Sequence, residues 1–533
     1  MILLSLVLLS LSWHQIPMPG PGTMGSHASG GTPSLTQFFG KNVITRSTTT
    51  GMNAPIFTLD PTAWPNGVTT GSLVIVSGEW PNNPTTGNGY VQTCASPCTP
   101  TLTDNGNSGS GNTWNSTFTV GSGCKDAGIA IPNGADHNIY YAMNFVPPAT
   151  TTPTQVTVTW GHKTGDFYFG LGSFYNIATT GALRTSSCKT AVVPTNNTAP
   201  NISGTGITVV VGDLVYIEVD DESENNTMQQ GNAWGAITIP SGCTLLDENT
   251  FAGHLEMYCI ATATSFTPAV TISQTTHDSF TIMAAAFKPG SGGSAPTGSG
   301  AQVLASSQNM SNVAATYVQN IPCPTNTTMV VVTDDASYVT SVSDSLSNNF
   351  SSVSNGGGSG TVWYHSVTIS NPNTYTISAV SAGGGNDLLT YYCTTATSLD
   401  TAATAGSGST QITSSSVFKD TTAGSTPSTG ASISGVPLIT PGETNDLLIG
   451  TGTMGTGPVL SVSGPTGVVD DFPCPTAINA CSVTTAGVCG GDSSGLTNGD
   501  VGLHFFDTAQ TQLSFNFVVN PSQSLGMLIT AFH

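Results

Sequence analysis

Charged residues are scarce in this sequence. Asp, Glu, Lys and Arg make up only 7% of its 533 residues, whereas they make up about 25% of a typical globular protein. Lys and Arg together number 8 and Asp and Glu 29, so the formal net charge is −21. A chain with so few basic side chains can neutralise few phosphates. The composition therefore argues against nucleic acid and anionic membranes as partners.

Long apolar runs and helical periodicity are also missing. No stretch beyond the N-terminus is long and apolar enough for a transmembrane helix, so we expect no transmembrane segment. No long stretch repeats apolar residues every 3.6 positions, which predicts few helices. The N-terminal run MILLSLVLLSLSW has the length of a signal peptide, although a buried apolar strand is the alternative. We expect a signal-like leader at 1–20, a flexible segment at 21–40, and a secreted or cell-surface protein.

Zinc-type cysteine motifs are absent as well. None of the eleven cysteines forms a CxxC pair, and no Cys/His group has zinc spacing, so disulfides in an oxidising compartment are expected. The odd number leaves at least one thiol free or paired between chains. Closeness in sequence favours two pairs, Cys94–Cys98 and Cys243–Cys259. Cys489 is expected to pair with Cys474 or Cys481, although sequence alone leaves other connectivities open.

The sequence does contain a fourfold internal repeat. Four segments begin with a strongly apolar run: GSLVIVSGEW from Gly71, GDLVYIEVDDE from Gly212, TTMVVVTDDAS from Thr327 and NDLLIGTGTM from Asn445. Each is followed by three further strand-like runs, and several of these alternate apolar and polar residues, as in TQVTVTW. A period of two predicts antiparallel strands with one buried face.

Two of the repeats also share a turn-like stretch, TLTDNGNSGSGNTWNS and SVSDSLSNNFSS. We interpret each as a hairpin in which Asp104 or Asp344 closes the turn through side-chain hydrogen bonds. Trp114 and Phe350 would then return to the core. The alternative is a chance likeness in a sequence of low complexity.

These motifs carry a resemblance to a known class of module. The G-D-L-V run, the S-V-S-D-S…N-N-F turn and the aromatic Y-Y or W-Y run resemble tandem jelly-roll or immunoglobulin-like β-sandwich modules of secreted bacterial surface proteins and phage particles. The resemblance implies an all-β fold of four tandem antiparallel β-sandwich domains, and it transfers no active site. The fourth repeat lacks the Asp-x-x-x-Asn turn. The expected boundaries are sandwich 1 at 41–190, sandwich 2 at 191–290, a Gly/Ser/Pro linker at 291–300, sandwich 3 at 301–405 and sandwich 4 at 406–533.

The stretch CGGDSSGL, residues 489–496, is similar to the nucleophile loop of chymotrypsin-type serine proteases. None of the nine histidines has the Ala-Ala-His-Cys-like setting of the base in that family. Ser494 also stands where the family usually has glycine after the nucleophile. We therefore interpret Ser493 as part of a glycine-rich turn, and we expect neither catalytic residues nor enzyme activity.

Acidic residues recur at the end of the first apolar run of the repeats. Carboxylates gathered on a loop suit Ca²⁺, which takes 6–8 oxygen ligands. The candidate calcium ligands are Asp220, Asp221, Glu222, Asp334 and Asp335. No EF-hand or other fixed spacing is present, so a solvated acidic loop is the alternative.

Aromatic residues and sequons give two further sets of candidates. Trp64 and Trp80 lie in turn-like settings and could stack on sugar rings, with a packing role as the alternative. Seven Asn-x-Ser/Thr sequons are candidate glycosylation sites. They are Asn115, Asn196, Asn201, Asn225, Asn309, Asn326 and Asn349.

The sequence therefore predicts a secreted, non-enzymatic structural or adhesive surface protein, such as a subunit of an extracellular filament. The alternative is a secreted carbohydrate-binding or carbohydrate-active protein. Lysine is almost absent from the repeated runs, so exposed sheet edges would lack the usual charge that prevents pairing. The segment from Ser34 to Ser47 could be donated to a neighbouring chain, or it could be the first strand of its own domain. Expected partners are further copies of the chain, other surface proteins or glycans.

Overall fold

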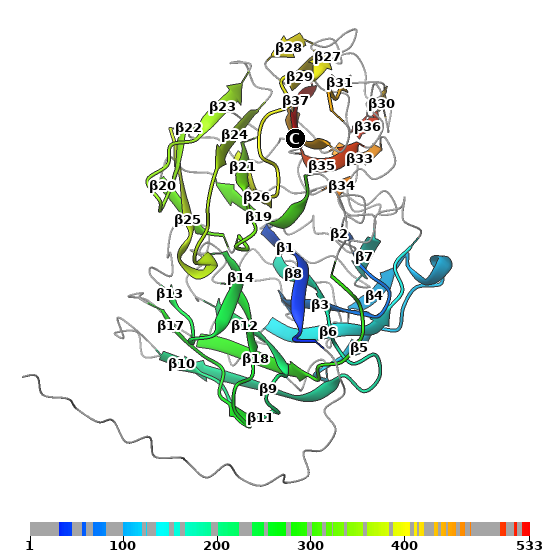
Figure 1. Cartoon of the computed structure of the whole chain (residues 1–533), viewed down its shortest axis with the longest axis vertical. Helices are drawn as coiled ribbons and strands as arrows, with labels where there is room; N and C mark the ends of the chain where they lie inside the picture. Colours follow the sequence, from blue (N-terminus) through cyan, green and yellow to red (C-terminus); the bar gives the residue numbers. More distant parts are fainter. Residues whose placement is uncertain are drawn as a thin grey trace, which may run out of the picture.

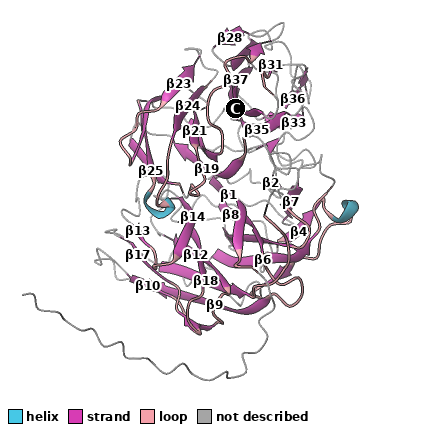
Figure 2. Ribbon diagram, viewed as in Figure 1, coloured by secondary structure: helices cyan, strands magenta, loops and turns pink. Residues whose placement is uncertain are grey.

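The fold is all-β. The computed structural model of the chain describes residues 31–44, 56–59, 68–81, 100–119, 124, 135–148, 154–159, 166–192, 201–222, 237–249, 254–272, 279–295, 301–311, 316–321, 323–334, 338–354, 360–382, 387–405, 410–412, 415–420, 431–434, 439–443, 446–454, 459–463, 469–470, 501–507, 516–519 and 525–533. Within these ranges the helices are two three-residue 3₁₀ turns, η1 (Asn107–Gly109) and η2 (Pro372–Thr374), as Figure 2 shows. Neither has the length or hydropathy to cross a membrane. The expectation of an all-β chain with few helices is confirmed.

The described strands fall into four sets along the chain. Strand set 1 (34–175) holds β1 (Ser34–Ile44), β2 (Ile56–Leu59), β3 (Ser72–Pro81), β4 (Thr101–Asp104), β5 (Asn115–Ser116), β6 (Ala135–Phe145), β7 (Thr154–Thr159) and β8 (Asp166–Tyr175). Strand set 2 (183–287) holds β9 (Leu183–Val192), β10 (Asn201–Ser203), β11 (Ile207–Thr208), β12 (Leu214–Glu222), β13 (Ile237–Thr238), β14 (Cys243–Asn249), β15 (His254–Ile260), β16 (Ser265–Phe266), β17 (Ala269–Ile272) and β18 (Ser279–Phe287).

The other two sets follow in the same manner. Strand set 3 (303–394) holds β19 (Val303–Ser311), β20 (Thr316–Asn320), β21 (Met329–Asp334), β22 (Val339–Asp344), β23 (Ser351–Ser354), β24 (Thr361–Ser366), β25 (Thr376–Ser381) and β26 (Asp387–Thr394). Strand set 4 (404–532) holds β27 (Thr404–Ala405), β28 (Thr410–Ile412), β29 (Ser415–Asp420), β30 (Ala431–Ser434), β31 (Ile439–Thr440), β32 (Asp446–Met454), β33 (Val459–Ser463), β34 (Val469–Asp470), β35 (Val501–Asp507), β36 (Asn516–Val519) and β37 (Leu525–Phe532).

One order of strands recurs in all four sets. In strand set 1 the strands pair as β1-β8-β3-β6-β5 and as β2-β7-β4. The corresponding orders are β9-β18-β12-β15-β14 with β10-β17-β13, β19-β26-β21-β24-β23 with β20-β25-β22, and β29-β37-β32-β35-β34 with β30-β36-β33. Each set thus has a larger sheet, in which the first strand lies beside the last, and a three-stranded sheet.

The larger sheets of strand sets 1 and 3 are joined into one ten-stranded sheet. The junction is a parallel pairing of β1 with β19, in which Phe38 lies opposite Ala305. Figure 1 shows β1, in blue, beside β8 and near β19 in the middle of the molecule. On its other side β1 pairs antiparallel with β8 of its own strand set. In this chain Ser34–Ile44 is therefore a strand of its own fold, which is the alternative that the sequence left open for the segment from Ser34 to Ser47.

Alternating side chains of the larger sheets enter two different cores. In β12, Val215 and Ile217 pack with residues of β17 and the rest of strand set 2. Leu214 and Tyr216 point to the opposite face and pack with Leu73 and other residues of strand set 1. A strand covered on both faces needs apolar residues at successive positions, which explains the near-continuous apolar runs in the sequence.

The two turns expected from the sequence are present. Asp104 accepts hydrogen bonds from the Gly106 and Asn112 backbone N–H groups and from Trp114 Nε1, at 2.8–2.9 Å. Asp344 accepts from the backbone N–H groups of Leu346 and Asn348, at 3.0 and 2.9 Å.

The aromatic residues that follow both turns pack as predicted. Trp114 lies against a buried apolar cluster, and Phe350 is itself part of one. Each carboxylate closes its turn because it accepts hydrogen bonds from several backbone N–H groups of the turn at once.

Three parts of the expected domain division differ from the observed pairing. Strand β1 begins at Ser34, inside the segment 21–40 that was expected to be flexible, and it pairs with β8. Strand β9 lies mostly inside the expected first domain, which ends at residue 190, but it pairs with β18 in the sheet of strand set 2. Residues 291–295 were expected to begin a flexible linker. Instead the Asn176 N–H donates to the Gly292 carbonyl at 2.7 Å, and the Ser294 N–H donates to Thr69 Oγ1 at 2.7 Å. These residues are therefore packed against strand set 1.

Candidate functional site

A cluster of polar and ionisable side chains is buried between strand sets 1 and 2. It lies where the outer faces of their larger sheets meet, and none of its residues is more than 2% exposed. The members are Ser77 on β3, His137 on β6, Tyr216, Glu218 and Asp220 on β12, and His254 and Glu256 on β15. We call this group the interface cluster.

The register of β12 and β15 gathers four of these residues on one face. Glu218 lies directly opposite Glu256, and Asp220 lies directly opposite His254. Because side chains two apart on a strand share a face, both pairs project toward strand set 1. Two carboxylates placed opposite each other repel, so this arrangement needs positive or donor groups nearby.

Asp220 is the centre of the interface cluster. Its Oδ2 lies 3.0 Å from His137 Nδ1, and its Oδ1 contacts His254 Nδ1. Burial alone would raise the pKa of Asp220, but the charge of His254 and the hydrogen bonds from both histidines lower it below its usual range. Burial alone would lower the pKa of His254, but the charge of Asp220 and hydrogen bonds to Asp220 and Glu256 raise it.

Glu256 is held by donors from both strand sets. The Tyr216 hydroxyl donates to its Oε2 at 2.7 Å, and the Ser77 hydroxyl donates to Oε1. Burial, followed by the charge of Glu256, raises the pKa of Tyr216 well above its usual value, so the phenol remains a donor. The carboxylate lies against Gly170 of β8, where a side chain would occupy the same space.

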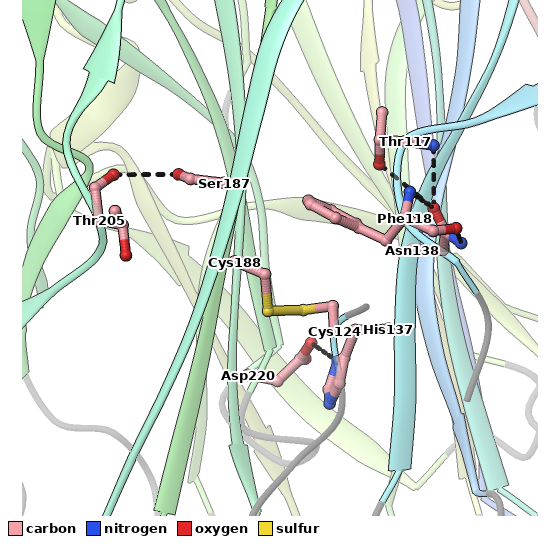
Figure 3. The surroundings of a disulfide bond; sticks show 9 residues. All are labelled: Thr117, Phe118, Cys124, His137, Asn138, Ser187, Cys188, Thr205 and Asp220. Atoms are coloured by element: carbon pink, nitrogen blue, oxygen red, sulfur yellow. Dashed lines mark hydrogen bonds and ion pairs between the residues drawn. A yellow bond between two sulfur atoms is a disulfide. The ribbon is translucent and has the colours of Figure 1, made fainter. Parts of the chain in front are cut away.

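A disulfide bond lies next to the interface cluster, as Figure 3 shows. It joins Cys124, in the range of strand set 1, to Cys188 on β9 of strand set 2. The backbone N–H of His137 donates to the Cys124 carbonyl at 3.2 Å, which holds the His137 backbone beside the disulfide. Strand sets 1 and 2 are therefore linked both covalently and by ionisable groups.

Two more disulfides lie within single strand sets. Cys243 pairs with Cys259, the bond expected from the sequence, and Cys323 pairs with Cys393. All cysteines in the described ranges are in disulfides. The other cysteines with expected pairings, Cys94, Cys98, Cys474, Cys481 and Cys489, lie outside the described residues.

The candidate calcium ligands are not gathered on one loop. Asp220 is buried in the interface cluster, and Asp221 and Glu222 continue strand β12. Asp334 is buried at the end of β21, where it accepts a hydrogen bond from the Val339 N–H at 2.8 Å. Asp335 lies outside the described residues. The alternative, a solvated acidic loop, is therefore wrong for Asp220 and Asp334, and calcium binding by these residues stays a prediction.

The remaining candidates are spread over the molecule. Trp80 pairs with Asp136 at the end of β3, whereas Trp64, Ser493 and the sequon residues Asn196 and Asn225 lie outside the described residues. The other sequon residues occupy two kinds of position. Asn115, Asn201 and Asn309 are in strands β5, β10 and β19, and Asn326 and Asn349 are exposed outside strands.

Sequence reasoning missed most of the interface cluster, including His137, His254 and Glu256. A usable signal was present in two apolar runs. In LVYIEVD, acids stand two positions apart at Glu218 and Asp220, and in HLEMY a histidine and a glutamate do the same. Ionisable residues two apart in an otherwise apolar strand lie on one covered face, which predicts a buried polar cluster.

Comparison with known proteins assigns no relationship. No protein-family model matches the chain, and no curated protein shows significant similarity to it.

Proposed function

We propose that the four strand sets are β-sandwich domains of the jelly-roll type, and that the chain is a secreted, non-enzymatic structural protein of an extracellular surface assembly. The proposal rests on the architecture as a whole. The recurrence of one strand order four times, with the copies packed face to face and edge to edge, carries it most directly.

The strand order favours a jelly roll over an immunoglobulin-like domain. Each strand set has eight principal strands in two sheets, and its first strand pairs with its last, as in β1 with β8. An immunoglobulin domain places its first strand beside its second, in a sheet that does not contain the third. Here the first and third strands, β1 and β3, both flank β8.

The enclosure of the ionisable residues supports a structural role. The interface cluster holds three carboxylates and two imidazoles, the residue types that general acid–base catalysis uses. Each of them is at most 2% exposed, so a substrate cannot reach them while the sheets are in contact. Their hydrogen bonds connect strand sets 1 and 2, and the nearby Cys124–Cys188 bond does the same.

Disulfides also support the proposed location outside the cell. Three are present in the described residues, and such bonds persist in oxidising compartments. In an exposed structural protein they would keep the strand sets folded where no chaperone acts.

An edge for assembly is available on strand set 3. Strand β23 ends the strand order of the ten-stranded sheet, and its sequence is SSVS, without a charged residue. Ser351, Ser352 and Ser354 are exposed. At the other end the sheet stops at the two-residue strand β5, a short edge of the kind that resists pairing.

The test is the state of the full-length secreted protein in solution. We expect analytical ultracentrifugation to show concentration-dependent association and electron microscopy to show ordered assemblies. Ser352→Lys should weaken association by placing a charge on β23. The matched control, Ser370→Lys, changes an exposed serine outside the strands and should leave association intact. A wild-type protein that stays monomeric at high concentration would contradict the proposed assembly.

A further inference from the structure

Three residues of the interface cluster are placed so that one ion could bind them all. His137 comes from β6 of strand set 1, and Glu218 and Asp220 come from β12 of strand set 2. One potential ligand atom from each lies within 4.8 Å of the other two, and all three side chains are buried. The separation is short enough for a common ion after small side-chain rotations.

The charge of the interface cluster favours a bound cation. It contains the carboxylates of Glu218, Asp220 and Glu256 but only two imidazoles, those of His137 and His254. The acids outnumber the imidazoles by one even if both imidazoles are protonated. Buried charge is costly unless it is paired or coordinates a metal ion. A divalent cation would supply positive charge where the carboxylates meet.

The ligand types decide which class of ion fits. Ca²⁺ and Mg²⁺ take oxygen ligands, whereas imidazole suits Zn²⁺ and the neighbouring first-row divalent ions. We propose that His137, Glu218 and Asp220 bind a first-row divalent metal ion, with Zn²⁺ as the probe, and that this ion joins strand set 1 to strand set 2. The site shares Asp220 with the calcium set expected from the sequence but differs in its other ligands and in its metal.

A neighbouring hydroxyl points to a ligand at the same place. Thr281 of β18 lies directly opposite Asp220, on the face that packs against strand set 1. Its side chain is 1% exposed, and its Oγ1 makes no hydrogen bond. A buried hydroxyl without a partner costs free energy. A water molecule on the metal ion would supply the missing partner.

The rest of the interface cluster can orient the ligands. His254 Nδ1 contacts Asp220 Oδ1 and lies 3.9 Å from Glu218 Oε1, and His254 Nε2 lies 3.5 Å from Glu256 Oε1. Groups that hold the ligands of a metal ion in this way typically alter its affinity by about 10–100-fold when removed. The site does not depend on the self-association proposed above.

The test uses the full-length chain with its disulfides intact. Because the residues are buried, the ion has to enter while the strand sets separate. The protein is therefore unfolded in denaturant and refolded with Zn²⁺, with Ca²⁺ or with a chelator, and then dialysed against metal-free buffer. We expect one tightly held Zn²⁺ per chain by elemental analysis, no retained Ca²⁺, and a higher unfolding midpoint for the sample refolded with Zn²⁺.

Variants assign the bound ion to these residues. Glu218→Gln and His137→Gln should each lower Zn²⁺ affinity at least about tenfold in competition with a chromophoric chelator. Glu443→Gln and His365→Gln are the matched controls, since Glu443 is exposed and His365 is on β24 of strand set 3. Near-ultraviolet circular dichroism identifies any variant that fails to fold.

The wild-type measurement decides the outcome even if a variant fails to fold. One Zn²⁺ per wild-type chain, lost in Glu218→Gln but kept in Glu443→Gln, supports the site. Failure of the refolded wild-type protein to retain Zn²⁺ overturns it. So does a Glu218→Gln protein that folds and binds Zn²⁺ as tightly as wild type.

Discussion

Two interfaces between larger sheets differ sharply in their polar residues. Strand set 1 packs on strand set 2 through apolar residues such as Leu73 and Leu214 together with the interface cluster, whereas strand set 3 packs on strand set 4 through apolar residues such as Val331, Ile449 and Phe532. Tyr364 and Phe532 meet edge to face across the second interface, with ring centroids 5.9 Å apart.

Corresponding positions of the repeat show how the difference arises. The fifth residue, counted from the first apolar position of the central strand, is Ser77 on β3 and Glu218 on β12. It is Thr333 on β21 and Thr451 on β32. All four side chains are buried, so one structural position has been filled with an acid in one copy and with hydroxyls in the others.

The two kinds of residue satisfy their hydrogen bonds differently. At the second interface Thr394 Oγ1 donates to the Met329 carbonyl of its own sheet at 3.0 Å. The carboxylate of Asp220 instead reaches across the first interface to His137 of the opposing sheet. A threonine thus tolerates any apolar partner sheet, whereas a buried acid requires one particular partner. The first interface should therefore be more specific for its partner sheet and more sensitive to substitution than the second interface.

Removing the central charge should have the largest effect. Asp220→Asn keeps the shape of the side chain but takes the negative charge from two buried histidines, so we expect a loss of about 3–5 kcal/mol of unfolding free energy. Thr451→Val at the second interface should cost at most about 1 kcal/mol. Denaturant unfolding at one fixed concentration of metal ions measures the loss of unfolding free energy in both variants.

Equal costs for Asp220→Asn and Thr451→Val would contradict the comparison. They would mean that the ionisable groups contribute no more to their interface than hydroxyls do. His365→Gln is a suitable control, because it removes an ionisable side chain away from both interfaces. His365 is half-buried beside the ring of Phe350 in strand set 3.

Two disulfides of similar span give the next comparison. Cys124–Cys188 closes a separation of 64 residues and joins two strand sets, whereas Cys323–Cys393 closes 70 residues within one. The chain-entropy model assigns about 4 kcal/mol to a loop of either length. We therefore expect similar losses of stability for Cys124→Ala/Cys188→Ala and Cys323→Ala/Cys393→Ala.

Hydrogen exchange separates the two disulfides. The first double variant should lose amide protection in β12 and β15 together with β6, because the two strand sets can then part. The second should lose protection only within strand set 3. Protection changes confined to strand set 2 in the first variant would show that the disulfide does not couple the two sets.

A glycine of the first interface gives a smaller, steric test. Gly170→Ala would place a methyl group inside the space of the Glu256 carboxylate and push it from its donors, which we expect to cost about 1–3 kcal/mol. Gly206→Ala is the control, because the nearest side-chain atom to its new methyl group would be Thr267 Oγ1 at 3.2 Å. If both alanines cost the same in denaturant unfolding, close packing of Glu256 on β8 is wrong.

Much of the fold could be predicted from the sequence because it depends on local patterns. Period-two alternation gave the strands, the Asp104 and Asp344 turns follow from short motifs, and the Cys243–Cys259 bond lies between neighbouring strands. Pairing between distant strands has no such local signal. The parallel pairing of β1 with β19 and the position of β9 in strand set 2 depend on contacts far apart in sequence.

The interface cluster was hidden for a related reason. A run such as LVYIEVDDE reads equally well as a strand ending in a solvated acidic loop, and it becomes a buried cluster only because another sheet covers it. His137 lies 83 residues from Asp220 along the chain, so no spacing motif connects them. A sequence can indicate which face of a strand is polar, but the partner that covers this face is set by the tertiary packing.

Strand set 4 contains a carboxylate whose protonation should have the smallest effect of the series. Asp446, at the start of β32, is buried beside Asp400, and its Oδ1 lies 3.2 Å from His533 Nδ1. Burial, followed by the hydrogen bond and charge of Asp400, raises the pKa of Asp446 to about 7. The folded protein therefore holds this proton more tightly than the unfolded chain, in which an aspartate titrates near pH 4.

The sign of the pH dependence follows from that difference. Stability from the protonated Asp446 is fully present below about pH 4 and is lost as the pH rises through about 7. Asp446→Asn keeps a neutral side chain at every pH. Between pH 4 and 7 we therefore expect wild type to lose at least about 1 kcal/mol relative to Asp446→Asn. Unfolding midpoints measured across this range test it, with Glu443→Gln as the exposed control. Parallel profiles for wild type and Asp446→Asn would show that Asp446 is already ionised in the folded protein, and that strand set 4, like the first interface, holds a buried carboxylate in its ionised form.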